Sequence, residues 1–469
     1  MSESYHQTAI ASLRDGNLFI KDAFIEGKWT AKDATFDVYE PSTSTVLGRV
    51  ANCNREDIQK AVKSAAKAQP TYFRNTTGKS RGALLRKWHD LIMANAEDIG
   101  TILSLENGKT ISEAKGEVVY AASFIAWFAE EATRSYGVTI PSSTPDTTLL
   151  TVREPVGVCG IITPWNFPAA MITRKLAVEA GFAPELIQVC PTKDREAATE
   201  LATNLLVKKI SFTGSTGVGK MLARLASGTL KKVSLELGGN APFIVFDDAD
   251  LDLAVEGAMF CKFRCSGQTC VCANRIYVQR NVAKEFTAKL IEKVSALKMG
   301  PGLDDSSTQG PLVNKAAVKK VQEHVDDAVS KGAKVELGGS ARQDSDGYFF
   351  QPTILSGVTR EMAVARDETF GPLAPIFEFD TEDDAVTLAN DTEFGLAGYF
   401  FSRDVSRAMR VAHKLQVGMV GVNTGKISAA EAPFGGVKES GYGKEGSLYG
   451  LEEYQVTKSI TFGNLNVGP

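Results

Sequence analysis

Two apolar stripes at helical spacing mark residues 55–127. Their members are Ile58, Val62, Ala65 and Ala66, followed by Leu84, Leu85, Trp88, Leu91 and Ile92. Spacings of one, three and four residues place each set along one side of a helix. The pattern therefore predicts amphipathic helices over this region.

The pattern changes over 136–153, where the sequence is YGVTIPSSTPDTTLLTVR. Thr, Val and Pro are frequent there and strong helix formers are rare, which is typical of strands on either side of a turn, here at Pro145 and Asp146. We expect a hairpin arm that can pair with the C-terminal segment YQVTKSITFG. Because an exposed strand edge readily pairs with another chain, the arm is a candidate for subunit contact.

After the arm, apolar runs alternate with segments of helical character. The runs VGVCGIITP and KKISFTGST come first, and a second series begins near Asn240 with APFIVFDDAD and continues to MVGVN. Strands that alternate with helices are typical of parallel, doubly wound sheets. The predicted fold class is α/β, with two such units and the arm.

The composition is that of a soluble globular protein, with 43% hydrophobic and 23% charged residues and a net charge of −4 over 469 residues. This balance argues against a nucleic-acid partner, or a membrane partner bound through bulk charge. Apolar stretches are shorter than the roughly 20 residues that a membrane helix needs. No secretory or mitochondrial signal is evident, so we expect a cytoplasmic protein. The length predicts two or three domains.

The seven cysteines are too sparse for a disulfide scaffold, and an odd number cannot all pair within the chain. Four of them are close in sequence: Cys261, Cys265, Cys270 and Cys272. This cluster has no C-x-x-C pair and the histidines are scattered, so we predict no metal site. Free thiols in a reducing compartment fit best.

The segment GSTGVGK at 214–220 follows a predicted strand and opens a predicted helix. Backbone N–H groups at such a helix start suit a phosphate, which makes Gly214 and Ser215 candidate contacts. The spacing also matches the phosphate loop of NTPases, but Met221 stands where that loop needs a hydroxyl for magnesium. A dinucleotide needs no metal there. An ordinary glycine-rich turn is the third interpretation.

Three residues are candidates for catalysis. Cys270 ends FRCSGQTC, and because only about 3% of an ordinary thiol is ionised at pH 7, an active cysteine needs a stabilising neighbour. Glu236, before a Gly-Gly turn, is a candidate base, and the amide of Asn166 in TPWNFP can stabilise an oxyanion. Taken singly, they also fit a buried small side chain, a solvated strand end and a residue that satisfies its own turn.

Together, these motifs resemble the NAD(P)-dependent aldehyde dehydrogenase family. TPWNFP, FTGST, LELGGN, GQTC, ETFGP at 368–372 and PFGGVKESG at 433–441 occur in the family's order, and the resemblance runs from about Phe19 to Phe462. It implies two doubly wound α/β domains and a β arm for oligomerisation into a homodimer or homotetramer. The expected parts are a dinucleotide-binding domain at 1–135 and 154–237, a catalytic domain at 238–447, and the arm at 136–153 and 448–469.

The resemblance also implies individual roles. Cys270 corresponds to the nucleophile that forms a thiohemiacetal and then a thioester, Glu236 to the base that activates water, and Asn166 to the oxyanion-binding residue. The implied cofactor is NAD or NADP. Its expected contacts are Thr163, Trp165, Gly214, Ser215, Glu368 and Phe370.

Further details resemble the branch that acts on succinate semialdehyde. In that branch, the positions of Arg174, Arg264 and Ser428 hold the far carboxylate of the substrate, and Arg suits a carboxylate because it binds it bidentately. Cys272 matches a C-x-C pair that closes reversibly under oxidation. Glutarate semialdehyde and lactaldehyde are the alternative substrates.

Between Arg174 and Phe212 the chain is shorter than the family pattern. ITRKL runs directly into AVEAGFAPELIQV, so the nucleotide-binding sheet is expected to lack one βα unit. The omitted piece includes the lysine that holds the adenosine ribose, and neither Lys175 nor Lys193 lies in its context. The chain is then either a working enzyme whose sheet has closed over the gap, or a truncated and catalytically impaired family member.

Overall fold

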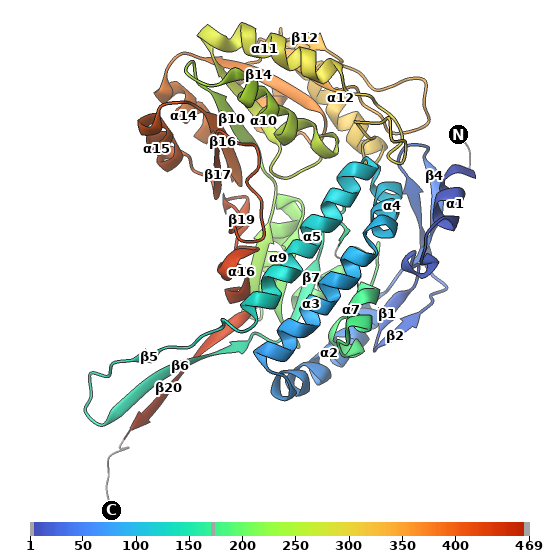
Figure 1. Cartoon of the computed structure of the whole chain (residues 1–469), viewed down its shortest axis with the longest axis vertical. Helices are drawn as coiled ribbons and strands as arrows, with labels where there is room; N and C mark the ends of the chain where they lie inside the picture. Colours follow the sequence, from blue (N-terminus) through green and yellow to red (C-terminus); the bar gives the residue numbers. More distant parts are fainter. Residues whose placement is uncertain (1–3, 170–173, 464–469) are drawn as a thin grey trace, which may run out of the picture.

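The computed structural model describes residues 4–169 and 174–463. Figure 1 shows two α/β bodies against each other and a long β arm that projects away from them. The predicted helical region consists of α2 (Arg55–Asn75), α3 (Gly78–Ala94), α4 (Ala96–Asn107) and α5 (Ile111–Glu131). Capping boxes begin α2, α3 and α5, which satisfies backbone N–H groups that would otherwise lack partners. Ile58 and Val62 are buried as their stripe predicts.

Short elements precede these helices and pack against them. They are α1 (Ser4–Ala11) and two antiparallel hairpins, β1 (Ala23–Ile25) with β2 (Lys28–Thr30) and β3 (Thr35–Glu40) with β4 (Thr45–Ala51). The side chains of Ile58 and Val62 on α2 join a buried cluster with Ile210 and Phe212 of the first large sheet. The N-terminal helices therefore cover that sheet.

In the described part of the chain, the first large sheet has four strands, in the order β19-β9-β8-β7. The strands are β7 (Val158–Ile162), β8 (Val207–Thr213), β9 (Lys232–Glu236) and β19 (Gly441–Tyr442), and α9 (Thr216–Ser227) connects β8 to β9. β7, β8 and β9 are parallel, whereas β19 arrives from the far end of the sequence and is antiparallel. The carboxyl ends of the parallel strands therefore meet along one edge, which in such sheets is where ligands bind. We call this the nucleotide sheet.

The region before β8 is short. It contains α7 (Arg174–Ala180), the 3-10 turn η2 (Pro184–Leu186) and α8 (Arg195–Thr203). Val189, at the end of the segment AVEAGFAPELIQV, forms a single antiparallel bridge with Phe24 of β1. Within the described residues, β7 is therefore an edge strand of the nucleotide sheet.

The second large sheet, the catalytic sheet, has seven strands among the described residues, in the order β12-β13-β14-β11-β10-β16-β17. All neighbouring pairs are parallel except β12 with β13. The strands are β10 (Ala241–Val245), β11 (Ala273–Gln279), β12 (Lys334–Leu337), β13 (Thr353–Ser356), β14 (Leu373–Phe379), β16 (Ala397–Phe401) and β17 (Met419–Val422). The helices are α10 (Leu251–Phe263), α11 (Arg280–Ser295), α12 (Lys315–Ser330), α13 (Ala363–Arg366), α14 (Glu382–Asn390) and α15 (Val405–Lys414).

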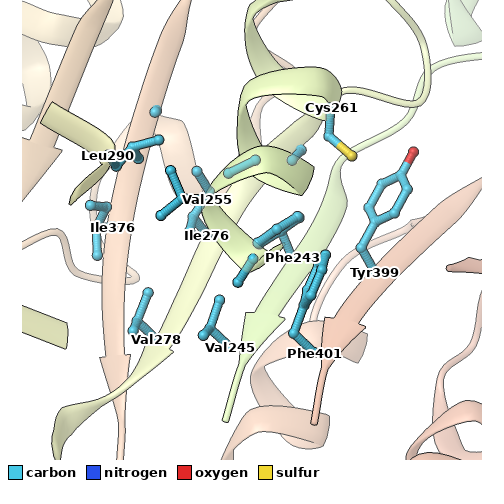
Figure 2. Close-up of a cluster of buried hydrophobic side chains, with 14 of the residues drawn as sticks. Phe243, Val245, Val255, Cys261, Ile276, Val278, Leu290, Ile376, Tyr399 and Phe401 are labelled. Carbon is cyan, nitrogen blue, oxygen red and sulfur yellow. The ribbon is translucent and has the colours of Figure 1, made fainter. Parts of the chain in front are cut away.

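Apolar side chains cover both faces of the catalytic sheet. Figure 2 shows one face, where Phe243 and Val245 of β10 pack beside Ile276 of β11 and Phe401 of β16. The rings of Phe243 and Phe401 are 4.9 Å apart. Burial on both faces explains why these strands are nearly continuous apolar runs in the sequence.

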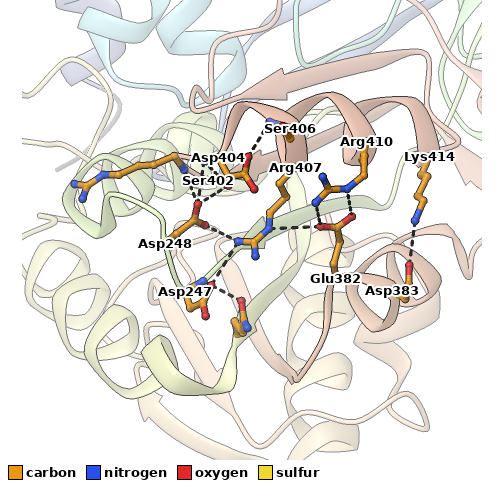
Figure 3. A network of polar contacts seen from close by, with 12 residues as sticks. Asp247, Asp248, Glu382, Asp383, Ser402, Asp404, Ser406, Arg407, Arg410 and Lys414 are labelled. Atoms are coloured by element: carbon orange, nitrogen blue, oxygen red, sulfur yellow. Dashed lines mark hydrogen bonds and ion pairs between the residues drawn. The ribbon is translucent and has the colours of Figure 1, made fainter.

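Salt bridges close the carboxyl end of this sheet (Figure 3). Nη1 of Arg407 on α15 lies 2.7 Å from Oδ1 of Asp248, and its Nε lies 3.5 Å from Oε2 of Glu382 on α14. Cys270 precedes β11 and therefore lies at the opposite, amino end. The catalytic sheet thus presents its amino end, and the nucleotide sheet its carboxyl end, to the region between them.

The arm matches its prediction. β5 (Thr139–Ile140) and β6 (Thr147–Pro155) form the hairpin, with a left-handed Asp146 in the turn, and β20 (Gln455–Gly463) pairs with β6 along its whole length. The remaining short elements are β15 (Phe394–Gly395), β18 (Val437–Lys438) and α16 (Ser447–Glu452). None of the described helices has both the length and the apolar character to cross a membrane.

Candidate active site

Cys270 and Glu236 face each other between the two sheets. Glu236 is the last residue of β9, and Cys270 lies between the 3-10 turn η3 (Arg264–Gly267) and β11. The Cys270 thiol donates a hydrogen bond to Oε1 of Glu236 over 3.3 Å. The structure thus brings together the predicted nucleophile and the predicted base, which are 34 residues apart in sequence.

The glycines after Glu236 make this approach possible. A Cβ on Gly239 would lie 2.3 Å from the carbonyl oxygen of Cys270, which is closer than atoms can approach. The N–H of Gly239 also donates to Oε1 of Glu368 over 2.9 Å. The Gly-Gly turn therefore allows the end of β9, the Cys270 loop and Glu368 to meet.

The loop before Cys270 has an unusual backbone. Cys265 and Ser266 both have positive φ, at 50° and 55°, a region that costs energy for residues other than glycine. Side-chain hydrogen bonds hold the loop there: Ser266 Oγ donates to the carbonyl of Gly310 over 2.7 Å, and Gln268 Nε2 donates to that of Cys265 over 3.1 Å. A strained, fixed loop beside a reactive residue keeps that residue in one position.

Burial changes the protonation of the reacting pair. Burial and the neighbouring charge of Glu445 raise the pKa of Glu236 to about 8. Burial, with a further contribution from Glu236, raises the pKa of the Cys270 thiol well above its usual range. Both shifts favour the protonated forms. At neutral pH, a reactive thiolate therefore requires transfer of the thiol proton to a neighbouring base.

A small, partly open pocket is lined by Glu236 and Glu445. Polar groups in its wall include Ser211, Ser234 and Lys444. Burial raises the pKa of Glu445, whose carboxylate accepts a hydrogen bond from Glu236. The pocket therefore places a second carboxyl group beside that of Glu236.

Asn166 lies on the other side of the Cys270 loop. It is only 7% exposed, and its Nδ2 donates to the carbonyl of Gln268 over 2.8 Å. An amide nitrogen carries two protons, so the second can be donated to an oxygen beside Cys270. This placement suits the predicted role in oxyanion binding.

A buried ion pair fixes the Asn166 loop. The ammonium of Lys109, whose side chain is 1% exposed, pairs with Glu117 of α5 and donates to the carbonyl of Asn166 over 2.9 Å. Glu117 in turn accepts from the backbone N–H of Ala169 over 3.2 Å. Burial of the Glu117 carboxyl raises its pKa, and Lys109 offsets part of that shift. The pair therefore ties both ends of the Asn166–Ala169 segment to the helices.

The predicted phosphate contacts lie at the end of β8. The N–H of Gly214 donates to the carbonyl of Glu236 over 3.0 Å, which joins the ends of β8 and β9. Ser215 is the N-cap of α9, and among the described hydrogen bonds its side chain caps no backbone N–H of the helix. The first turn of α9 contains no acidic residue. This helix start therefore offers N–H groups and a hydroxyl to an anion.

The other predicted cofactor residues lie close to the reacting pair. The rings of Trp165 and Phe370 meet edge to face, 5.9 Å apart. Burial raises the pKa of Glu368 to about 7. Trp165 is exposed, as is Thr163, which follows β7. Thr163 and Trp165 follow β7 at the carboxyl end of the nucleotide sheet, as Gly214 and Ser215 follow β8, whereas Glu368 and Phe370 precede β14 of the catalytic sheet.

The predicted carboxylate-binding residues form a second group beside the pair. The guanidinium of Arg264 lies 4.7 Å from the ring centre of Phe260, and its Nε is buried with no hydrogen-bond partner among the described residues. Ser428 shares a hydrogen bond with the hydroxyl of Tyr120 on α5, and burial raises the pKa of that hydroxyl to about 12. The side chain of Arg174, which begins α7, lies outside the described residues.

A model of the aldehyde dehydrogenase family matches residues 29–179 and 175–460. The chain belongs to the aldehyde dehydrogenase family. It is 50% identical to a glutarate-semialdehyde dehydrogenase of Pseudomonas putida, over 96% of this chain and 99% of the relative. It is also 50% identical to succinate-semialdehyde dehydrogenase [NADP(+)] 1 of Schizosaccharomyces pombe, over 97% of each chain. A crystal structure of an aldehyde dehydrogenase from Brucella melitensis biovar abortus shares 50% identity, with a TM-score of 0.94 and coverage of 96% and 99%.

These matches confirm the predicted family and its α/β fold, and they identify the chain as an oxidoreductase enzyme. Relatives named for glutarate semialdehyde, succinate semialdehyde and 3-sulfolactaldehyde match at 50%, 50% and 48% identity, so the comparisons do not fix the substrate.

Four residues that contact the candidate site were not predicted from the sequence: Lys109, Glu117, Tyr120 and Glu445. Glu117 offered one signal, because it occupies a helical position next to Val118, in a helix with a buried apolar side. A charge on such a side requires a buried partner. The partner, Lys109, lies before the helix, and nothing in the pattern connects it to Asn166.

Proposed function

We propose that this aldehyde dehydrogenase oxidises succinate semialdehyde to succinate with NAD or NADP, through a thiohemiacetal and a thioester on Cys270. Glutarate semialdehyde is the second candidate substrate, because a relative of equal identity carries that name. The observation that carries the proposal is the hydrogen bond of 3.3 Å between the Cys270 thiol and Glu236. We also propose the predicted division into domains and a cytoplasmic homo-oligomer joined through the arm.

In the first step, Cys270 attacks the aldehyde carbon. Glu236 accepts the thiol proton, because the existing hydrogen bond already points from sulfur to its carboxylate. The carbonyl oxygen gains negative charge and receives N–H bonds from Asn166 and from the backbone of Cys270. A preorganised donor of this kind lowers the barrier by about 3–4 kcal/mol.

In the second step, Glu236 removes a proton from a water molecule that attacks the thioester. We propose that this water approaches from the side of the small pocket that Glu236 and Glu445 line. A base with a pKa near 8 is well matched to this task near neutral pH. The bond between Cys270 and the acyl group then breaks, and the acid leaves.

The residues at the edge of the nucleotide sheet fit a dinucleotide. The start of α9, with Ser215 as N-cap, suits the pyrophosphate, and the ring pair of Trp165 and Phe370 lies at the Cys270 end of the same edge. Glu368 would hold a ribose hydroxyl. When bound, the dinucleotide supplies the acceptor for the hydride that the thiohemiacetal releases.

We propose that the nucleotide sheet lacks one βα unit and still supports catalysis. The alignment with the Schizosaccharomyces pombe relative spans 485 positions, which exceeds the 469 residues of this chain. The two family matches also meet at 175–179, inside the short region. The contact between Cys270 and Glu236 supports retained thiol chemistry, and cofactor binding decides between a working enzyme and an impaired one. Titration with NAD and NADP tests this choice, and absence of binding at millimolar concentration of either would favour the impaired form.

Arg264 provides the test of the substrate. Because its buried Nε lacks a partner among the described residues, we propose that the guanidinium binds the far carboxylate of the semialdehyde. Arg264→Ala is expected to raise the KM for succinate semialdehyde roughly 10–100-fold and to change the KM for propanal less than about twofold. Arg280→Ala, which removes an exposed Arg paired with Asp380, is the control and should change neither. An equal loss for both aldehydes would reject the assignment.

A further inference from the structure

A pair of thiols lies outside the active site, between the N-terminal hairpins and the short region before α8. Cys53 immediately precedes Asn54, the N-cap of α2, and Cys190 follows Val189, which bridges to Phe24. Both side chains pack into one small apolar cluster with Ala51 of β4. Neither residue contributes to the proposed catalytic steps.

Hydrogen bonds join Cys53 to the residues that follow Cys190. The N–H of Cys53 donates to the carbonyl of Pro191 over 2.8 Å. The hydroxyl of Thr192 donates to the carbonyl of Cys53 over 2.7 Å. These two hydrogen bonds join Cys53 to the two residues that directly follow Cys190 and hold the chain segments side by side. The two cysteines therefore lie on adjacent segments of the fold.

The side chains are also in contact, because the Cys190 thiol is hydrogen-bonded to the sulfur of Cys53. This hydrogen bond lowers the pKa of Cys53. Lys32 lies near both sulfurs and pairs with Asp57, in the first turn of α2. A lysine and a helix start both favour a thiolate. The environment thus differs from that of Cys159 in β7, where burial raises the pKa to about 11.

We propose that Cys53 and Cys190 form a redox-active thiol pair that closes to a disulfide when a hydroperoxide is the oxidant. Cys190 is half-buried, whereas Cys53 is only 1% exposed, so the oxidant reaches Cys190 first. The Cys190 sulfur takes one peroxide oxygen and becomes a sulfenic acid, and the other oxygen leaves as an alcohol or as water. The Cys53 sulfur then attacks the Cys190 sulfur: the S–S bond forms, the S–O bond breaks, and hydroxide leaves as water with the Cys53 proton.

The bond would connect the beginning of α2 to the segment that replaces the longer family sequence. α2 covers the nucleotide sheet, and Cys190 also packs against the cluster that contains Ile210 and Phe212. A cross-link over so long a stretch of chain restricts the unfolded state strongly. Oxidation is therefore expected to stabilise the nucleotide sheet, the less completely covered of the two.

The full-length protein is treated with hydrogen peroxide, and its peptides are mapped by mass spectrometry without reduction. The expected result is a linked peptide pair that contains Cys53 and Cys190, which dithiothreitol separates. The midpoint of thermal unfolding should rise by roughly 5 °C on oxidation. Cys53→Ser and Cys190→Ser should each abolish the rise, whereas Cys159→Ser should retain it.

Peptide mapping of the unaltered protein is decisive even if a variant folds poorly. The proposal is overturned if Cys53 and Cys190 both remain open to alkylation after Cys270 has been oxidised. It is also overturned if Cys190 proceeds to a sulfinic acid with no linked peptide. Both outcomes are independent of the substrate and cofactor of the enzyme.

Discussion

The central strands of the catalytic sheet and the edge strand β7 of the nucleotide sheet differ in how completely they are buried. Every residue of β10 and β16 is buried, whereas β7 is mostly half-exposed and its Ile161 is 55% exposed. Yet both sheets contribute directly to the active site, Cys270 from one and Glu236 from the other. The proposed nucleophile therefore stands beside a well-packed support, while the proposed base and the predicted pyrophosphate contacts Gly214 and Ser215 belong to a sheet that ends at β7 among the described residues.

Chemical function and stability are thus distributed differently over the molecule. Loss of the base should affect catalysis far more than folding, loss of a core side chain in the catalytic sheet should affect folding, and changes at the β7 edge should affect neither strongly. The predictions below follow that order.

The largest effect is expected for Glu236→Gln. The variant lacks the base for both steps, so kcat should fall by about 10²–10⁴-fold. In the unaltered protein, kcat should rise roughly tenfold per pH unit up to about pH 8, because the raised pKa keeps Glu236 protonated below that value. Steady-state rates from pH 6 to 9 test this. A variant with the same slope as the unaltered protein would remove Glu236 from the role of base.

A large loss of stability is expected for Phe243→Ala in β10. The ring is fully buried between neighbouring strands, so its removal leaves a cavity and should cost about 3–5 kcal/mol of the free energy of unfolding. Equilibrium unfolding in urea, followed by circular dichroism, measures this loss. A cost below about 1 kcal/mol would contradict the view that the catalytic sheet is the rigid half.

The matched change in the nucleotide sheet is Ile161→Ala in β7. Because more than half of this side chain is already exposed, the same urea experiment should give a loss below about 1 kcal/mol. A loss as large as that of Phe243→Ala would show that a partner covers the β7 edge in solution.

The smallest effects are expected in native-state hydrogen exchange, a measurement that needs no substitution. Amides of β7 should exchange before those of β10 and β11, since strands with an open edge and half-exposed side chains open at lower free energy. Added NADP should slow exchange in β7, β8 and β9 and leave the catalytic sheet unchanged. Equal protection of the two sheets without cofactor would remove the contrast between them.

Much of the fold was predictable from the sequence because periodicity reports burial directly. The helical stripe of Ile58 and Val62, the apolar strands and the hairpin arm were all located from local pattern. The pairing of β19 with β9 could not be predicted, because Gly441 and Tyr442 form a strand too short to give a periodic signal.

The candidate site was predictable where short motifs surround the reacting atoms, as for Cys270 and Asn166. The supporting residues Lys109 and Tyr120 could not be predicted from motifs, because their partners are distant in sequence. Tyr120 reaches Ser428 across 308 positions, and only the fold determines that contact. The side chain of Arg174, predicted from a motif, lies outside the described residues, so its role stays a prediction.

The central claim is that the substrate becomes attached to Cys270 before water releases it. The most direct measurement mixes the unaltered protein with NADP and succinate semialdehyde, quenches it in acid within one turnover, and analyses the intact protein and its peptides by mass spectrometry. Because the acyl group is attached to Cys270 before water releases it, the account predicts a succinyl thioester on Cys270 that hydroxylamine removes. Formation of NADPH while Cys270 stays unmodified and open to iodoacetamide would contradict it.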